Sequence, residues 1–539
     1  MAPKQSRPVS GGPGRPTRRL KKEATLNVDD LFAQAEVLKH KVVPVEWFVD
    51  GDLLENLAAE NVENFQKLLS PFRPVAPSGE RTWGTMCSCS EGTHYVIKAM
   101  EKAYLAVNIS CRLRQVFACE ILEDRRIWIH KVINAKSDPG DWICIFEDIL
   151  KMGGDEAYCW VHKKKCKIKP ADIVFVGTSC KDFSRQNCNA GRRESIFSQQ
   201  DTKGGSAQTF RGFMLYCDYH TPFILFYENV TEVDSESIED VVSENDFDIL
   251  MAEFSSRNYE GKRFVVDAQF FALPARRRRL VVLFIRIIAT PSASFELRPC
   301  NTMFETMGNL VRLCQRAPPC LRDVLYRDDH PAVEKELTRR LGEGTPTGKT
   351  STDWADSHMR LYRSKGLRWG TSLLNEATQS SPWIRFVLPR ERECAEFSME
   401  TKPEAFARDL SQSIDRVSHS SRHEFSQDHV APTQLPKQQI WLDWASHPSA
   451  GKVVPRLLLG QEALLLQGFP VAKATGPVST TQEMTMQQLA GNMFSLPVVL
   501  GVTQAAFSLL FHGATPQLRS AHHLPTRTPA RHMNSQNPC

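Results

Sequence analysis

Five short apolar runs, separated by amphipathic stretches, constrain the fold of this chain more than any other feature. They are rich in β-branched and aromatic residues and read QVFACEI, WICIFEDI, ADIVFVG, FILFYENV and RLVVLFIRI. Such runs are typical of strands buried on both faces, and their alternation with amphipathic segments indicates βαβ units. We therefore expect residues 82–290 to form an α/β domain with a doubly wound, mostly parallel sheet.

The remaining chain divides by composition. Residues 1–25 are basic and rich in Pro, Gly and Ser, which predicts a disordered tail, and residues 26–81 are expected to form a helical extension. Residues 291–453 are dominated by Ser, Thr, Pro and charged side chains with weak apolar periodicity, which indicates a separate irregular domain or a large insertion. Residues 454–512 become apolar and helical again and should complete the first domain, and residues 513–539 should form a second disordered tail.

Composition is that of a soluble globular protein, with 41% hydrophobic and 24% charged residues. The net charge of +5 permits a nucleic-acid partner without requiring one. No apolar leader precedes the 15 cysteines, so we expect reduced thiols in an intracellular protein. Residues 494–511 carry no charge, but Pro497, Gln504 and Ser508 interrupt them, so a buried core helix is expected rather than a membrane span.

The basic tail contains the segment PGRPTRRLKK. It resembles both the core of an AT-hook, which lies in a narrow minor groove of DNA, and a nuclear-import signal. A solvated basic tail without a specific role is an equally good interpretation. With the import signal, the expected location is the nucleus.

Polar side chains follow four of the predicted strands. Cys180 comes after a small-residue turn, Glu120 and Asp148 end two earlier strands, and Glu228 and Asn229 end a later one. Open α/β sheets bind their ligands at the carboxyl ends of the strands, so these side chains are candidates for one site. A buried structural thiol and a helix-capping acid are the alternatives for Cys180 and Glu120.

Four consecutive arginines, residues 276–279, come directly before the last apolar run. An arginine run is usually a solvated face. Here alternate members must point toward the sheet or toward a bound anion, because the strand begins at once.

The order of these features resembles the C5-cytosine methyltransferase family. The matching segments are Ser179-Cys180-Lys181 with the following DFS, Glu228-Asn229-Val230, ARRRR at residues 275–279, QEALLLQGFP at residues 461–470, and Gly491-Asn492. The gap between Arg279 and Arg456 has the size of that family's target-recognition region. Together, in this order, the motifs cover residues 82–290 and 454–511.

The resemblance implies the fold of S-adenosylmethionine-dependent methyltransferases and transfer of a methyl group to carbon 5 of cytosine in DNA, on a base flipped out of the duplex. It implies Cys180 as the nucleophile, Glu228 as the acid and Arg279 as the cation at O2 of the base, supported by Arg277. Three further residues are expected to bind substrate: Lys181, Ser184 and Asn229. The residues expected to bind S-adenosyl-L-methionine are Cys87, Ser90, Gly92, Glu120, Asp148 and Asn492.

The chain also departs from the family pattern. The glycine-rich first motif reads MCSCSEG at residues 86–92 and keeps only Ser88 and the last glycine. No proline precedes Cys180, and Ala275 stands where the family has glutamine. Lys181 replaces the usual glutamine; its ammonium either favours the thiolate of Cys180 or points to solvent or a DNA phosphate. Two alternatives remain: an RNA methyltransferase of the tRNA-methylating branch, and an inactive DNA-binding scaffold.

Cys159, His162 and Cys166 have a spacing that suits zinc. Zinc sites normally need four ligands, and the neighbouring sequence offers no evident fourth. The sequence therefore predicts no metal site.

Overall fold

The computed structural model describes residues 28–68, 80–135, 137–183, 196–197, 205–234, 245–289, 296–297, 301–344, 353–370, 372–403, 405, 407–411, 430–443, 454–475 and 481–510. The tails predicted at residues 1–25 and 513–539 lie outside the described residues, as does Ser184.

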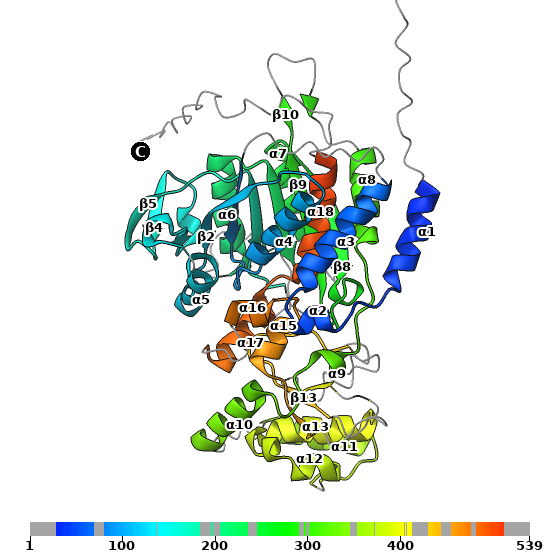
Figure 1. Ribbon diagram of the computed structural model, residues 1–539. Helices are drawn as coiled ribbons and strands as arrows, with labels where there is room; N and C mark the ends of the chain where they lie inside the picture. The colour runs from blue at the N-terminus through cyan, green and yellow to red at the C-terminus, as the bar shows by residue number, and fades with distance from the viewer. Residues whose placement is uncertain are drawn as a thin grey trace, which may run out of the picture.

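A mixed sheet of nine described strands forms the centre of the larger lobe (Figure 1). Its order is β5-β4-β3-β2-β1-β6-β7-β9-β8. The strands are β1 (Arg81–Met86), β2 (Leu113–Cys119), β3 (Cys144–Phe146), β4 (Glu156–Cys159), β5 (Lys164–Lys167), β6 (Ile173–Gly177), β7 (Ile224–Asn229), β8 (Tyr259–Asp267) and β9 (Arg278–Arg286). The five central strands are parallel, which confirms the predicted fold class; β4, β5 and β9 pair antiparallel with their neighbours.

Strand β1 marks the point where the winding of the sheet reverses. It pairs with β2 on one side and with β6 on the other. In doubly wound sheets the ligand crevice opens at the carboxyl ends of such strands. The register places Met86 beside Cys119 and Gly177 beside Glu228, so the predicted site residues follow strands that end at one edge.

Helices cover both faces of the sheet, because the inner strands alternate apolar side chains between two layers. In β6, Ile173 and Phe175 face one layer, and Val174 and Val176 face the other. The first layer contains α1 (Val28–Lys39), α3 (Leu53–Leu68), α4 (Thr93–Ala106), α5 (Glu123–Asn134), α8 (Asn301–Leu313) and α18 (Leu496–Leu510). The second contains α6 (Ser206–His220) and α7 (Asp246–Ser256).

A smaller lobe lies below the carboxyl edge of the sheet in Figure 1. It has its own core, which includes Trp383, Phe386 and Trp441. Its elements are α10 (Pro331–Glu343), α11 (Asp353–Ser364), α12 (Glu376–Ser380), α13 (Pro389–Thr401) and a small sheet of β12 (Ala407–Asp409), β13 (Ile440–Leu442) and β14 (Arg456–Leu457).

The predicted boundary of the target-recognition region at residue 291 is too early. Helix α8 packs against α18 and α1 in the larger lobe, and its Met307 and Leu310 are fully buried there. Its apolar residues recur at helical spacing and bury one face, which places it in the larger lobe.

The last helices return the chain to the larger lobe. They are α15 (Gly460–Leu465), α16 (Val471–Thr475), α17 (Glu483–Asn492) and α18. Among the described residues, one helical stretch, Glu483–Leu510, has the length and apolar composition of a membrane span, and 94% of its most apolar window is buried inside the protein. It forms part of the core, as the interrupting polar residues predicted.

Candidate active site

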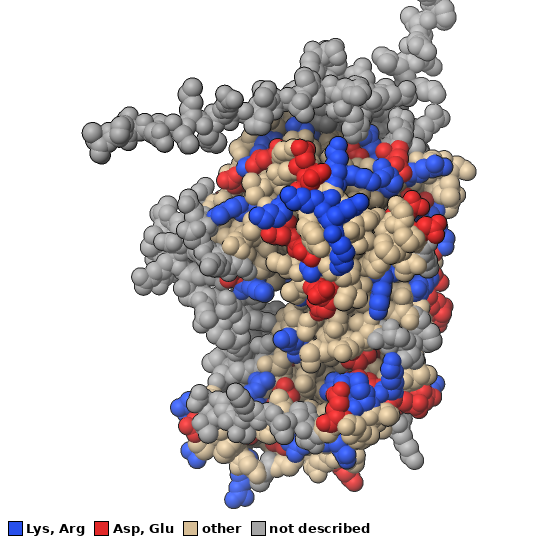
Figure 2. All heavy atoms as spheres, turned by 90° about the vertical axis from the view of Figure 1, so that its left-hand side faces the viewer, with Lys and Arg blue, Asp and Glu red and all other residues tan. Residues whose placement is uncertain are grey.

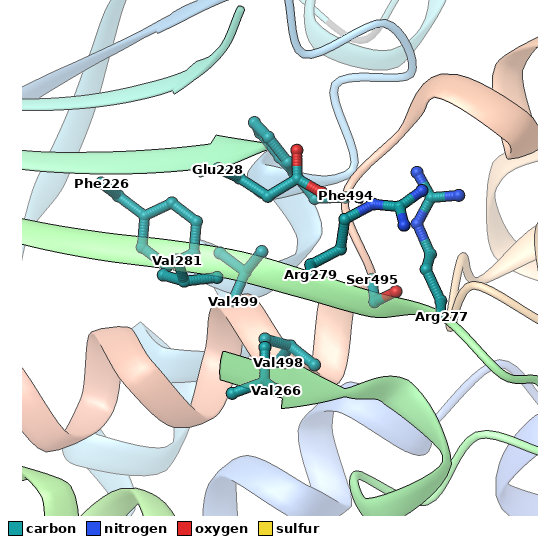
Figure 3. A pocket seen from close by; sticks show the side chains of 10 residues that line it. All are labelled: Phe226, Glu228, Val266, Arg277, Arg279, Val281, Phe494, Ser495, Val498 and Val499. Carbon is teal, nitrogen blue, oxygen red and sulfur yellow. Dashed lines mark ion pairs between the residues drawn. The ribbon is translucent and has the colours of Figure 1, made fainter. Parts of the chain in front are cut away.

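The predicted nucleophile and its two partners come from three neighbouring strands. Cys180 lies three residues after β6, Glu228 is the last residue but one of β7, and Arg279 is at the start of β9. The Oε1 atom of Glu228 lies 3.1 Å from Nε of Arg279 (Figure 3). All three side chains are at least half-buried, and the charges of Glu228 and Arg279 act on the Cys180 thiol. The structure therefore brings the three together.

Burial dominates the protonation of this group. It raises the pKa of the Glu228 carboxyl above its ordinary value, and the positive charges of Arg279 and Arg277 offset only part of this shift. Burial also raises the pKa of the Cys180 thiol, again with Arg279 acting in the opposite sense. A carboxyl with a raised pKa can act as an acid, and a thiol with cations beside it can act as a nucleophile.

Arg277 is a positioning residue. Its guanidinium is 3% exposed and donates to the backbone carbonyls of Gln434, Gly491 and Met493, the last at 2.6 Å. Burial, together with the charge of Arg279, lowers its pKa to about 9. It thereby fastens the smaller lobe and the end of α17 to the start of β9. It also lines, with Glu228, Arg279 and Phe494, a small cavity (Figure 3).

Asn229, which the sequence predicts to bind substrate, makes its hydrogen bonds within the protein. Its amide nitrogen donates to Thr178 Oγ1 at 3.0 Å and to the Tyr227 hydroxyl at 3.1 Å, and its oxygen accepts from the Val230 amide at 2.8 Å. Its polar atoms are thus used inside the protein, since the side chain is only 1% exposed. The contacts with Thr178 hold the turn that carries Cys180.

Lys181 is exposed, next to the thiol in sequence. The cations that lower the pKa of Cys180 are instead Arg279 and Arg277. The two interpretations of Lys181 therefore stay predictions, with the arginines supplying the positive charge at the thiol.

The divergent first motif keeps the turn that glycines normally allow. Cys87, Cys89 and Glu91 adopt left-handed backbone conformations, with φ values of 56°, 64° and 56°. These conformations are uncommon for residues other than glycine and cost of order 1 kcal/mol or more each. The carboxylate of Glu91 offsets the strain by accepting from Ser88 Oγ at 2.6 Å, Thr85 Oγ1 at 2.8 Å and Gln115 Nε2 at 2.5 Å. Burial raises the pKa of Glu91 to about 7.

Glu120 and Asp148 follow β2 and β3, and both lie close to Cys87. Burial raises the pKa of the Cys87 thiol, and the charges of Glu120 and Asp148 add to this shift. Glu120 is 3% exposed; its Oε1 accepts from the Leu122 amide at 3.1 Å. Asp148 Oδ1 accepts from the Leu150 amide at 2.9 Å, so it caps the short helix η2 (Ile149–Lys151). Each of these backbone hydrogen bonds thus uses one of the two carboxylate oxygens of the acid.

The sequence reasoning missed Arg125. Its Nη1 lies 3.8 Å from Glu120 Oε1, and its buried Nε has no hydrogen-bond partner among the described residues. It also acts on the Cys89 thiol, lowering that pKa against the effect of burial. The signal was present in FACEILEDRR, where Arg125 falls in the first turn of the helix that follows Glu120.

The remaining predicted cofactor residues support the crevice. The Ser90 hydroxyl accepts from the Gly92 amide at 3.2 Å, and the Ser90 carbonyl accepts from Trp128 Nε1 at 3.0 Å. A Cβ at Gly92 would lie 2.6 Å from a Leu496 methyl group, so the glycine permits α18 to pack there. Asn492, at the end of α17, donates to the Gln488 carbonyl at 2.8 Å.

The strand order, the crevice beside β1 and the Cys-Glu-Arg group define a Rossmann-like methyltransferase. A profile of C-5 cytosine-specific DNA methylases matches residues 160–507, well over half of the chain. The chain belongs to this family.

One curated relative is "DNA (cytosine-5-)-methyltransferase DMT5" of Cryptococcus neoformans var. grubii, 24% identical over 467 residues. The match covers 81% of this chain but only 18% of that protein, so the chain spans about a fifth of its relative's length. Solved structures with similarity include Spodoptera frugiperda DNMT2, with 10% identity over 79% of this chain and 99% of that one and a TM-score of 0.37. Another is the Entamoeba histolytica methyltransferase EhMeth, with 11% identity over 80% and 99% and a TM-score of 0.38.

Proposed function

We propose that this protein transfers a methyl group from S-adenosyl-L-methionine to carbon 5 of cytosine in DNA, through a covalent bond between Cys180 and carbon 6. The observation that carries the proposal is the convergence of Cys180, Glu228 and Arg279 at one edge of the sheet, where β6 and β7 end and the antiparallel β9 begins. Family membership and the curated relative support the same reaction.

The crevice beside β1 fits the proposed cofactor. Cys87, Cys89 and Glu91 keep the left-handed turn that the family's glycines adopt in the first motif. We expect Glu120, buried just after β2, to accept from both ribose hydroxyls, and Asp148, just after β3, to contact the adenine. The unpartnered Nε of Arg125 offers a donor to the cofactor. When bound, the cofactor supplies an electrophilic methyl group on a sulfonium.

The side chains of the site suit the activation of cytosine. The Cys180 thiolate adds to carbon 6, and the proton of Glu228 passes to N3, so the ring electrons collect as an enamine at carbon 5. Arg279 stabilises the charge that develops at O2. Once carbon 5 is methylated, a base from solvent removes the carbon 5 proton, the C5–C6 double bond re-forms as the Cys180 thiolate leaves, and the N3 proton returns to Glu228. The bond to sulfur is thus made and broken in one turnover.

The smaller lobe supports a duplex substrate. Carbon 6 of a stacked cytosine is out of reach, so the base must leave the helix, and a second body is needed to hold the opened strands. Arg277 joins the segment that leads into β13 of the smaller lobe to Met493 of the larger lobe, beside Glu228 and Arg279. We further propose DNA as the partner and the nucleus as the location, the latter on the basic sequence of residues 1–25 alone.

Trapping with 5-fluorocytosine tests the proposal. Fluorine at carbon 5 prevents the final elimination, so the protein with S-adenosylmethionine should form an adduct that survives a denaturing gel. Duplex DNA and a tRNA that carry the analogue are compared in parallel. Cys180→Ser should abolish the adduct while cofactor affinity stays unchanged, and Cys320→Ser, a half-buried thiol outside the site, is the matched control.

The adduct distinguishes a DNA methyltransferase from an RNA methyltransferase and from an inactive scaffold. An adduct with DNA supports the proposal. An adduct with tRNA alone would keep the nucleophile and replace the substrate by RNA. No adduct with either, from a protein that binds the cofactor, would overturn the enzymatic assignment in favour of a scaffold. Nuclear fluorescence of a tagged chain that persists without residues 1–25 would contradict the import signal.

A further inference from the structure

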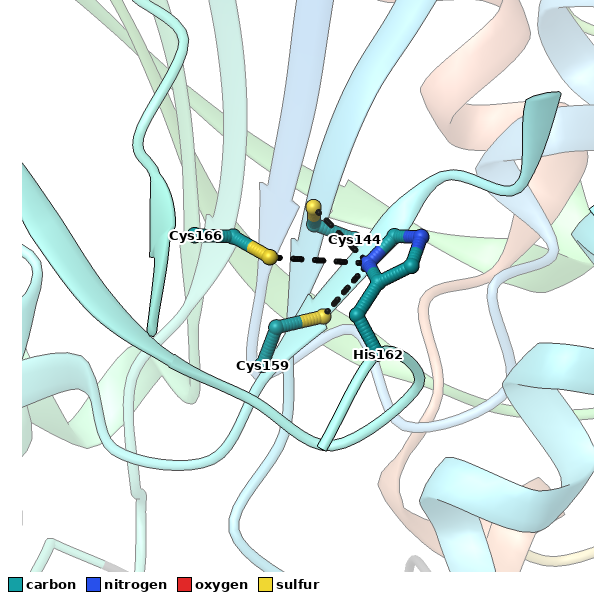
Figure 4. A group of neighbouring side chains, drawn as sticks. All are labelled: Cys144, Cys159, His162 and Cys166. Carbon is teal, nitrogen blue, oxygen red and sulfur yellow. Dashed lines mark hydrogen bonds between the residues drawn. The ribbon is translucent and has the colours of Figure 1, made fainter. Parts of the chain in front are cut away.

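A second cluster of reactive side chains lies at the edge of the sheet, outside the proposed active site. Cys144 begins β3, Cys159 ends β4, Cys166 lies in β5, and His162 is in the turn between β4 and β5. The three sulfurs lie 3.5, 3.3 and 3.6 Å from Nδ1 of His162 (Figure 4). All four ligand atoms lie within 4.8 Å of one another.

Hydrogen bonding alone does not explain this convergence. A neutral imidazole nitrogen has one lone pair or one hydrogen in the ring plane, so it can satisfy one thiol well but not three. The three cysteines are free thiols rather than a disulfide. One positive ion at the centre would satisfy all four atoms at once.

The spacing is that of tetrahedral zinc. With bonds of about 2.3 Å to sulfur and 2.0–2.1 Å to nitrogen, a tetrahedral ion holds sulfur and nitrogen roughly 3.6 Å apart. The observed distances of 3.3–3.6 Å agree with this value. Ligand atoms this close surround a single ion rather than an iron–sulfur cluster, and soft thiolates with imidazole favour zinc over magnesium or calcium.

We propose that Cys144, Cys159, His162 and Cys166 bind one structural zinc ion. The sequence alone showed three of these residues and predicted no metal site. The fourth, Cys144, lies 15 residues before Cys159 and reaches the cluster only through the pairing of β3 with β4. Four protein ligands close the coordination sphere, so the ion stabilises structure rather than activating water.

The charge around the cluster suits three thiolates. Zn²⁺ with three thiolates and a neutral imidazole carries a net charge of −1. Exposed lysines flank the ligands at residues 163–165 and at Lys167. Figure 2, which views the molecule from the side of β4 and β5, shows Lys and Arg side chains gathered on the larger lobe. The positive charge of the flanking lysines offsets the negative charge of the zinc complex.

The ion would connect the β4–β5 hairpin to the cofactor crevice. The Trp160 amide, in the turn that carries His162, donates to the Ile145 carbonyl of β3 at 2.8 Å. One residue later in β3, the Phe146 carbonyl accepts from the Glu120 amide at 3.0 Å. Zinc at the start of β3 would thus hold the strand that positions Glu120 and leads to Asp148.

Metal analysis of the full chain tests the proposal independently of methylation. We expect about one zinc ion per chain by inductively coupled plasma mass spectrometry after dialysis against metal-free buffer. His162→Ala and Cys166→Ser should lower this content at least tenfold. Cys166→His, which keeps a ligand, should retain zinc, and Cys320→Ser should match the wild type. Replacement by Co²⁺ should give the visible absorption of a tetrahedral thiolate complex in the wild type and not in Cys166→Ser.

Three results would overturn the proposal. The first is a folded wild-type chain, prepared with zinc present, that retains no zinc after dialysis. The second is zinc content that His162→Ala and Cys166→Ser leave unchanged while circular dichroism shows both variants folded. A disulfide between any two of the three cysteines in the freshly purified protein, found by mass spectrometry, would also exclude the site.

Discussion

Glu228 and Arg279 form an ion pair across two antiparallel strands, although neither residue is the other's direct partner. The register pairs Glu228 with Val281, so Arg279, two positions before Val281, is a diagonal neighbour on the same face. Diagonal side chains of this length can meet. The same alternation buries Arg277 and leaves Arg278 exposed. Arg277 and Arg279 thus point inward, whereas Arg278 is exposed and Arg276 is half-buried, in line with the alternation that the sequence predicted.

Glu228→Gln should lower kcat by about 10²–10⁴-fold, because the amide cannot deliver a proton to N3. In the wild type, the plot of kcat/KM against pH should be bell-shaped. Below the pKa of Glu228, kcat/KM rises with pH because more Cys180 is ionised; above the pKa of Cys180, it falls because less Glu228 carries a proton. The active form needs Glu228 protonated and Cys180 ionised, and burial raises both pKa values. Both limits should therefore lie above the ordinary values for Glu and Cys. The residual kcat/KM of Glu228→Gln should not level off at the pKa of Glu228. It should continue to rise with pH up to the pKa of Cys180. An unchanged lower limit in this variant would exclude Glu228 as the acid.

Arg279→Gln should raise the pKa of Cys180, because Arg279 is the largest influence that lowers it. The rate of alkylation by iodoacetamide, measured against pH without DNA, reports this pKa through the thiolate fraction. Lys181→Gln is the matched comparison. If Lys181 binds only phosphate, its variant should leave the alkylation profile unchanged, while the slope of log affinity for DNA against log salt becomes shallower by about one charge. A shifted profile in Lys181→Gln would instead show that the ammonium tunes the thiol.

Glu120→Ala should weaken cofactor binding by about 10- to 100-fold, the loss expected for hydrogen bonds to a charged group. Isothermal titration calorimetry with S-adenosylmethionine measures the change. Glu36→Ala, in the exposed part of α1, is the control and should leave the affinity unchanged. Equal affinities for the two variants would place the cofactor elsewhere.

Gly491→Ala should destabilise the protein by about 1–3 kcal/mol, as expected for overpacking against atoms that cannot move aside. Its Cβ would lie 2.2 Å from Pro436 N and 2.4 Å from Leu435 C, which are backbone atoms. Gly308→Ala, in α8, is the matched control. No atom lies within 4 Å of its Cβ position, so alanine should stabilise the helix by about 0.5–1 kcal/mol. Urea unfolding followed by tryptophan fluorescence gives both free energies of unfolding. Similar values for the two variants would show that the contact between the lobes is loose.

Much of the fold was readable in the sequence, because buried parallel strands need continuous apolar runs. All five predicted runs are strands, and the acids and the cysteine that end them share one edge of the sheet. Strands β1, β4, β5 and β8 escaped prediction. The edge strand β5 is exposed and rich in lysine, so it carries little apolar signal. The predicted domain boundary failed for a related reason: α8 looks amphipathic in isolation, and only its packing against α18 shows to which lobe it belongs.

For the site, the sequence by itself determined which side chains are candidates for the chemistry and in what order they come along the chain. Cys180, Glu228, Glu120 and Asp148 were predicted from their places at strand ends, and Arg279 from the family resemblance. Only the tertiary structure decided that Asn229 and Arg277 spend their polar atoms inside the protein, that Arg125 reaches Glu120, and that Cys144 completes a group of four ligands. The physical reason is that a strand end specifies where a residue lies along the chain. Whether its polar atoms are already satisfied depends on which other segments pack against it, and in this protein those segments lie from two to more than two hundred residues away.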